Sequence, residues 1–133
     1  MAVITEAAIR ELATMKGDRA PITSCYLDVD GRRVARHQDL EREVDILLHS
    51  ARAQADGEAS VQSDLNKISQ LVRSGLDRSR TRGLAIFSCT ADRLWQVIEL
   101  PVPVRARVVL NHVPALGQLD PDAIDQVCSE ARP

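Results

Sequence analysis

The chain has 133 residues, of which 44% are hydrophobic, 27% charged and 2% aromatic, with a formal net charge of −2. This length and apolar content suffice for one domain with an aliphatic core and exclude an intrinsically disordered chain. One Trp, one Tyr and one Phe do not supply both a core and a stacking platform for single-stranded nucleic acid, and the net charge gives no overall signature of nucleic-acid binding.

The cellular compartment follows from the cysteines and the N-terminus. Three widely spaced cysteines form no Cys-x-x-Cys pair, which favours a reducing compartment over a disulfide scaffold. The first residues are amphipathic and contain Glu6 and Glu11, unlike the apolar core of a signal peptide. No stretch approaches the ~18 apolar residues that span a membrane. We therefore expect a soluble cytoplasmic domain.

The predicted elements follow one another in the order α, β, α, α, β, β, β, α. Periodicity and turn signals place them at residues 5–17, 22–29, 34–55, 60–78, 83–89, 94–100 and 105–110, with a last short helix from residue 120. The run 83–89 is almost wholly apolar, which is typical of a strand buried on both faces. The simplest arrangement is an α+β fold in two layers, with one four-stranded, mostly antiparallel sheet packed with helices.

The two longest predicted elements are the helices over 34–55 and 60–78. Each has about 20 residues and is therefore a rod of about 30 Å. Because the connection is short, we expect them to pair as an antiparallel hairpin that protrudes from the domain. Their facing sides should bury four apolar side chains: Leu47, Leu48, Ile68 and Val72.

The chain contains no recognisable catalytic motif, since it lacks a P-loop, GxGxxG, GxSxG and HExxH. His37 and His49 lie twelve residues apart on one predicted helix and point in different directions, which disfavours a metal pair. Asp28 and Asp30 follow the first strand and are suited to a divalent ion or to acid–base work. Asp30 precedes a glycine, however, and we favour a simple turn. We predict no catalytic residue, no metal and no cofactor.

Other polar and sulfur side chains have structural interpretations. Cys25 and Cys89 lie in predicted strands and should be small buried hydrophobic residues without a neighbouring base. The acidic side chains of the first long helix should form its solvated face: Asp39, Glu41, Glu43 and Asp45.

Arginines gather on the last turns of the second long helix and in the segment after it. They are Arg73, Arg78, Arg80 and Arg82. Cations at a helix C-terminus complement its dipole, but four arginines exceed that need. Arginine also suits phosphate and carboxylate contacts, so RNA and an acidic protein surface both remain open as partners.

Four stretches, taken in order, resemble the N-terminal domain of the archaeo-eukaryotic class-1 peptide chain release factor superfamily, and within it the bacterial branch. They are ITSCYLDVDG, the helical hairpin with GEAS at its tip, RGLAIFSCT and RVVLNHVPALGQL, and together they cover most of the chain from Ile22 onward. The resemblance implies that residues 1–133 are the first of three domains in a longer protein. In that family the first domain occupies the ribosomal A site, the middle domain carries a Gly-Gly-Gln loop that promotes peptidyl-tRNA hydrolysis, and the third recruits partners.

The chain departs from the family at the residues that read stop codons. Codon readers carry Thr-Ala-Ser-Asn-Ile-Lys-Ser at the hairpin tip, whereas residues 58–64 here read EASVQSD, with Ser63 in place of the lysine. Asp56, Glu58 and Asp64 should make the tip acidic and repel an mRNA backbone. The family's Tyr-x-Cys-x-x-x-Phe element is also missing between residues 105 and 119. The candidate tip residues are Asp56, Gly57, Glu58, Ser60 and Ser63.

The sequence leaves two main hypotheses and a weaker third. The first is a ribosome-associated binding domain, active in rescue, hibernation or a related translation role, without stop-codon decoding. Its partners would be ribosomal RNA and the other domains of the same protein, with no membrane and no small-molecule cofactor. The second is a protein–protein interaction domain that kept the fold and binds through the hairpin. The third is a hydrolase that uses Asp28 and Asp30. Arginines on an open face favour the first, and arginines paired within the domain favour the second.

Overall fold

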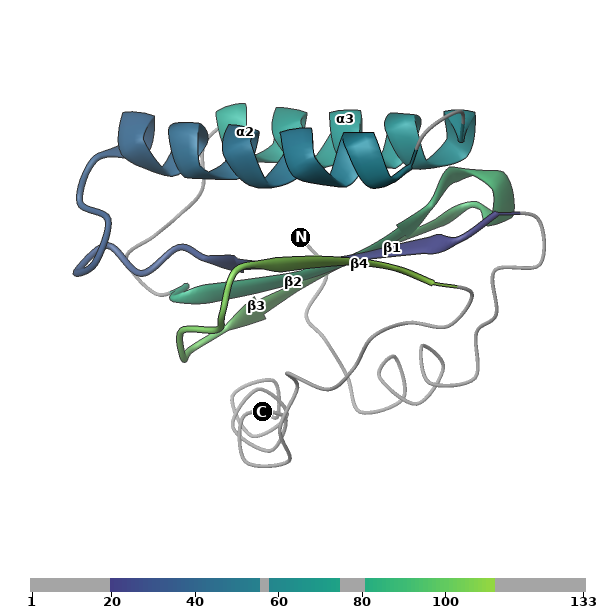
Figure 1. The fold of residues 1–133 in the computed structure, drawn as a ribbon. Coiled ribbons are helices and arrows are strands. Elements are labelled where there is room, and N and C mark those ends of the chain that lie inside the picture. The colour runs from purple at the N-terminus through teal and green to yellow at the C-terminus, as the bar shows by residue number, and fades with distance from the viewer. Residues whose placement is uncertain (1–19, 56–57, 75–80, 112–133) are drawn as a thin grey trace, which may run out of the picture.

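The computed structural model describes residues 20–55, 58–74 and 81–111. These residues form one four-stranded antiparallel sheet and two helices that cover one of its faces, which is an α+β fold in two layers (Figure 1). The helices predicted over 5–17 and from residue 120 lie outside the described residues. No helix in the described part is long and apolar enough to cross a membrane.

The sheet has the strand order β3-β2-β1-β4, and every neighbouring pair is antiparallel. Its strands are β1 (Ile22–Asp28), β2 (Gly83–Cys89), β3 (Leu94–Leu100) and β4 (Arg107–Asn111). The two apolar strands β1 and β2 are therefore central, and β3 and β4 form the two edges. In the register, Cys25 lies opposite Ile86 on one side and opposite Val108 on the other.

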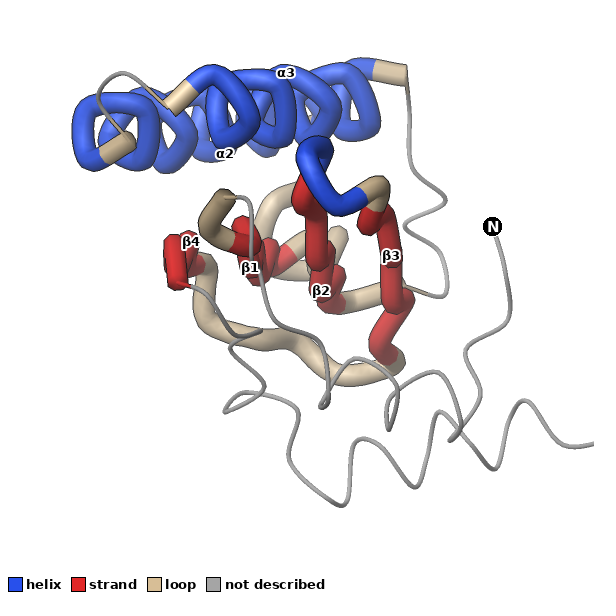
Figure 2. Tube along the Cα trace, turned by 90° about the vertical axis from the view of Figure 1, so that its right-hand side faces the viewer, coloured by secondary structure: helices blue, strands red, loops and turns tan. Residues whose placement is uncertain are grey.

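A one-turn 3-10 helix, η1 (Thr90–Asp92), joins β2 to β3. It ends at Arg93, whose φ of 58° places it in the left-handed region. Figure 2 shows this turn rising from the sheet towards the helix layer. β2 and β3 thus form an antiparallel hairpin whose turn lies beside the helices.

The helices are α2 (His37–Gln54) and α3 (Ala59–Arg73). Arg52 contacts Asn66 and Arg73 contacts Asp45, so the two helices pass each other in opposite directions. Both lie flat against the sheet (Figure 1), and the expectation that they protrude from the domain was wrong. The reason is packing: the apolar stripes of both helices need the sheet as a cover.

The core lies between the helices and the sheet. Leu48, Ile68 and Val72 are buried as predicted, whereas Leu47 is only partly buried where α2 packs near the β4 side of the sheet. The far face of the sheet is also covered at its centre, where Tyr26 and Phe87 meet edge to face with their ring centroids 6.1 Å apart. Every residue of β2 is buried, which confirms the prediction of a strand buried on both faces.

Gly83 at the start of β2 illustrates how closely this far face is packed. A Cβ atom at this position would lie 2.6 Å from the carbonyl oxygen of Val102 and 3.2 Å from a methyl carbon of Val104. The segment before β4 therefore passes directly over the strand, and only a residue without a side chain leaves room for it.

Replacing Leu48 by Ala should lower the free energy of unfolding by about 2–5 kcal/mol, because it removes a fully buried side chain. Urea unfolding followed by circular dichroism measures this loss. The matched control on the same helix is Ile46→Ala, since the Ile46 side chain is 67% exposed. Similar losses in both variants would contradict the packing of α2.

Candidate functional site

Asp64 of α3 is fully buried, and its carboxylate accepts four hydrogen bonds. Its Oδ1 accepts hydrogen bonds from the Ser88 hydroxyl (2.8 Å), the Thr90 hydroxyl (2.6 Å) and the Thr90 backbone N–H (2.9 Å). Its Oδ2 accepts a longer one from the Thr23 hydroxyl (3.3 Å). One carboxylate thus joins α3 to β1, β2 and η1.

This position corrects the prediction that Asp64 adds to an acidic tip. Thr23 and Ser88 are cross-strand partners, so their hydroxyls lie side by side on the helix face of the sheet. Asp64 also follows the helical spacing of Val61 and Ile68, which are both buried. The position of an acidic residue within the apolar stripe of α3 could have revealed this from the sequence. A carboxylate at such a position is buried and needs hydrogen-bond donors around it.

The other predicted tip residues divide into three groups. Asp56 and Gly57 lie outside the described residues. The Ser60 hydroxyl accepts a hydrogen bond from the backbone N–H of Ala91 (3.1 Å), and Ser63 is half-buried. Glu58 alone is exposed, immediately before α3. The described tip therefore faces the β2–β3 turn as well as solvent, which a protruding hairpin would not do.

The predicted arginine cluster is only partly described, because Arg78 and Arg80 lie outside the described residues. Arg73 is half-exposed and pairs with Asp45 of α2, with its Nη2 2.8 Å from Oδ2. Arg82 is exposed, and its backbone hydrogen-bonds to both Val29 and Leu100 at the end of the sheet. The structure does not test whether the four arginines form one surface.

With Asp64 turned inward, the outward surface of α3 carries no carboxylate over residues 59–73. Its charged side chains are Lys67 and Arg73, and both are exposed. Lys67 also extends over the ring of Trp95 on β3, with its Nζ 6.0 Å from the ring centroid. Trp95 is 40% exposed. Sequence reasoning did not select Lys67 and Trp95, since 28 residues of chain separate them and only the sheet brings them together.

Asp28 and Asp30 are both held by arginines. Asp30 accepts two hydrogen bonds from the Arg32 guanidinium and one from the Arg32 backbone N–H. Arg33 bridges two elements, with its Nε 2.6 Å from Asp28 and its terminal nitrogens 2.8 and 3.1 Å from Glu43. These pairs explain why the chain turns sharply after β1, and they leave the two aspartates poorly suited to bind a divalent ion.

The hydrogen bonds from Arg32 hold the pKa of the Asp30 carboxyl below its usual range. The hydrogen bonds from Arg33 lower the pKa of Glu43 in the same way. Glu43 and Asp45 are thus not merely a solvated face of α2, because each pairs with an arginine from another element. Within the residues that the structure describes, no group of three or more His, Cys, Asp or Glu side chains is placed to hold a metal.

Cys25 and Cys89 are both buried free thiols, as predicted. The expectation of no neighbouring base does not hold for Cys89, because its Sγ lies 3.4 Å from Oδ2 of Asp92. Burial raises the pKa of Cys25 to about 12 and raises that of Cys89 as well. Thiols that stay protonated are poor nucleophiles, which agrees with a structural role.

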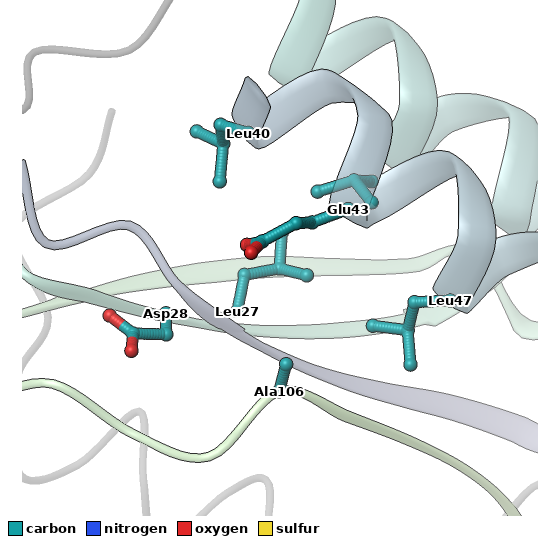
Figure 3. A pocket seen from close by; sticks show the side chains of 7 residues that line it. Leu27, Asp28, Leu40, Glu43, Leu47 and Ala106 are labelled. Atoms are coloured by element: carbon teal, nitrogen blue, oxygen red, sulfur yellow. The ribbon is translucent and has the colours of Figure 1, made fainter. Parts of the chain in front are cut away.

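A small hollow lies between α2 and the β4 side of the sheet (Figure 3). Leu40 and Leu47 approach it from the helix, and Leu27 and Ala106 approach it from below. Its volume of about 20 Å³ has room for a water molecule and is far too small for a metabolite. The hollow marks an incompletely filled edge of the core.

No protein-family model matches this chain, and no curated protein matches it either. The resemblance of the sequence to the release factor superfamily therefore stays a hypothesis.

Replacing Asp64 by Ala should lower the free energy of unfolding by about 3–5 kcal/mol, because buried hydroxyl and N–H donors lose their acceptor. Asp64→Asn should cost clearly less, about 1–2 kcal/mol, since its amide oxygen can occupy the place of Oδ1 and its NH₂ can donate to Thr23. Urea unfolding of both variants checks this order. Equal losses would mean that the carboxylate is not the link between α3 and the sheet.

Acidification should destabilise the protein partly through Glu43. A carboxyl whose folded pKa lies below its unfolded value contributes stability above the unfolded pKa, and this contribution is lost as the pH falls through the folded pKa. Glu43→Gln should therefore flatten the decline in urea midpoint below about pH 4.5, the ordinary pKa of this carboxyl. Asp39→Asn, which removes an exposed carboxylate from the same helix, is the control. An unchanged pH profile in Glu43→Gln would refute the contribution of the Arg33 pair.

Proposed function

We propose that this chain is a ribosome-associated binding domain that contacts ribosomal RNA through the outward surface of α3 and the arginine-bearing segment that follows it. It acts in the cytoplasm in a rescue, hibernation or related translation role, does not decode stop codons and performs no chemistry of its own. The sequence resemblance motivates this proposal, and the charge of the described surface supports it.

The observation that carries the proposal is the inward orientation of Asp64. This orientation removes the one carboxylate that α3 would otherwise present to solvent. The exposed charges of α3 are then those of Lys67 and Arg73, and both are positive. This side of α3 therefore adds no carboxylate of its own to repel a phosphate backbone, and the acid beside it is Asp45 of α2, which pairs with Arg73. Arg82 is also exposed, and it lies at the end of the sheet, where its backbone hydrogen-bonds to Val29 and Leu100.

The ion pair between Arg73 and Asp45 does not withdraw Arg73 from RNA. Both side chains are about half-exposed, with relative accessibilities of 53% and 50%. Exposed pairs of this kind contribute only about 0–1 kcal/mol to stability. A phosphate can therefore replace Asp45 at small cost, and the arginine is already held on the outer surface of the helix.

The proposal that the domain performs no catalysis is supported by the ion pairs of its two candidate catalytic carboxylates. Asp28 and Asp30 are the carboxylates best placed for acid–base or metal-assisted hydrolysis, and both are bound by arginine side chains. The hydrogen bonds from Arg32 lower the pKa of Asp30, whereas a general acid needs a raised pKa.

The second candidate is a protein–protein interaction domain that does not bind the ribosome. The Arg73–Asp45 pair favours it, since a basic side chain already paired within the domain does not need an RNA partner. The two candidates differ in their salt dependence, because phosphate contacts release counterions and protein contacts release few.

Co-sedimentation with ribosomes across a salt series tests the proposal. Arg73→Ala/Arg82→Ala should weaken binding and make the log–log salt slope shallower by roughly two units, one for each lost phosphate contact. Arg78→Ala/Arg80→Ala, in the segment outside the described residues, should act in the same direction.

The matched control is Arg52→Ala/Arg93→Ala, which removes two arginines near the opposite end of α3, where Gln62 contacts the Arg52 carbonyl and Arg93 follows η1. It should leave both affinity and slope nearly unchanged. If the control and test variants behave alike, or if neither salt nor Arg73→Ala/Arg82→Ala affects binding, the ribosomal RNA contact is wrong and the protein-interaction hypothesis is favoured.

A further inference from the structure

The β4 edge of the sheet is incompletely covered on the face that packs against the helices. On the same face of β4, Val108 and Leu110 are only partly buried, and so is Leu47 of α2 above them. The hollow lined by Leu40, Leu47 and Ala106 lies at this same place (Figure 3). Further apolar side chains would therefore complete the core at the β4 edge.

Within residues 20–55, 58–74 and 81–111, the backbone of β4 has a strand neighbour on one side only, namely β1. An edge strand presents a row of N–H and C=O groups that can pair with a further strand. Binding of an extended peptide at such an edge takes affinity from these groups and specificity from alternate side chains. The β4 edge combines this backbone with an adjacent apolar surface.

The two faces of β4 differ in character, and the register defines them. Val108 and Leu110 lie opposite Cys25 and Thr23, so they point towards the helices. Arg107 lies opposite Tyr26 and therefore points to the far face. Arg107 is exposed, and no described carboxylate forms an ion pair with it, in contrast to Arg32, Arg33 and Arg73.

The charge near this edge is not cancelled by the acids of the hollow. Asp28 and Glu43 line it, and both are bound by Arg33. The strand itself, Arg107–Asn111, contains no carboxylate. The complement of this surface is thus a strand with apolar side chains on one face and carboxylates on the other.

We propose that β4 is a docking edge for an extended, acidic segment of another protein, which adds to the sheet as a fifth strand. Its alternate apolar side chains cover Leu47, Val108 and Leu110, and its carboxylates lie on the far face beside Arg107. This surface is separate from the outward surface of α3, so it does not depend on ribosome binding. A second copy of this chain is a poorer occupant, because it would place two carboxylate-free edges with arginines side by side.

Fluorescence anisotropy with a labelled seven-residue peptide of alternating Glu and Val tests the proposal on the purified chain. The peptide should bind, and the same peptide with Lys for Glu, or with Ser for Val, should bind at least about tenfold more weakly. Methylation of alternate backbone nitrogens in the Glu/Val peptide should also abolish binding, because it removes the ladder hydrogen bonds.

Charge reversal locates the site. Arg107→Glu should weaken the Glu/Val peptide by about tenfold, or about 1.4 kcal/mol, and should restore binding of the Lys/Val peptide. Arg93→Glu, an equal charge change at the exposed turn before β3, should change neither. Circular dichroism checks that both variants are folded.

Four results would overturn the proposal. One is a Glu/Val peptide that binds no better than its Lys or Ser counterparts. Another is equal sensitivity to Arg107→Glu and Arg93→Glu. The third is a concentration-dependent dimer in sedimentation velocity that Arg107→Glu abolishes, since a second copy would then occupy the edge. Displacement of the bound peptide by an oligonucleotide of RNA would likewise assign the edge to RNA.

Discussion

The arrangement of the domain depends on one buried carboxylate. Asp64 has no access to solvent, and donors from β1, β2 and η1 converge on its two oxygens. Hydrophobic contact alone would allow α3 to slide along the sheet, because apolar packing is not directional. A charged acceptor with fixed donors permits one position, and any shift would leave a buried charge without its hydrogen bonds. The position of α3 in turn places the β2–β3 turn and the side of the helix that faces solvent.

The functional surfaces follow from this placement. Because Asp64 faces the sheet, the exposed side of α3 carries basic and neutral groups, while α2 keeps its acidic residues and pairs some of them with arginines from other elements. The helix layer thus presents a basic surface on α3 and an acidic surface on α2. Such a division favours one orientation of a charged partner over its reverse, which suits a binding domain.

The two edges of the sheet have different properties for a related reason. At the β3 edge, Lys67 of α3 extends over the ring of Trp95, which is itself 40% exposed. At the β4 edge, Leu47 and the helix-facing side chains of β4 remain partly exposed around a hollow. Edge strands tend to pair with other chains unless charge or cover prevents it. On the docking proposal, Arg107 disfavours a basic strand at β4 and favours an acidic one.

The helices, the strands and the turn after β1 are determined by residues close together in the chain, so the sequence was sufficient to locate them. Apolar periodicity located both described helices and all four strands to within a few residues, and the apolar run 83–89 correctly indicated a strand buried on both faces. The turn after β1 was likewise readable, because Asp30 was expected to form a turn and its side chain accepts the Arg32 N–H there. These features depend on neighbours in the chain, so a single sequence contains them.

Only the tertiary structure decided which way the polar residues point and which distant residues meet. Asp64 was taken for a surface acid, since its donors come from residues 24 to 41 positions away, and no local pattern links them. The arginines were expected to act as a group, yet Arg73 pairs with an acid 28 residues away on another helix. The helices were expected to protrude because their length was visible in the sequence, whereas the sheet face that they cover forms only when four separate strands assemble. Contacts between residues far apart in the chain leave no periodic pattern in the sequence. They nevertheless determine the charge of a surface, as the composition does.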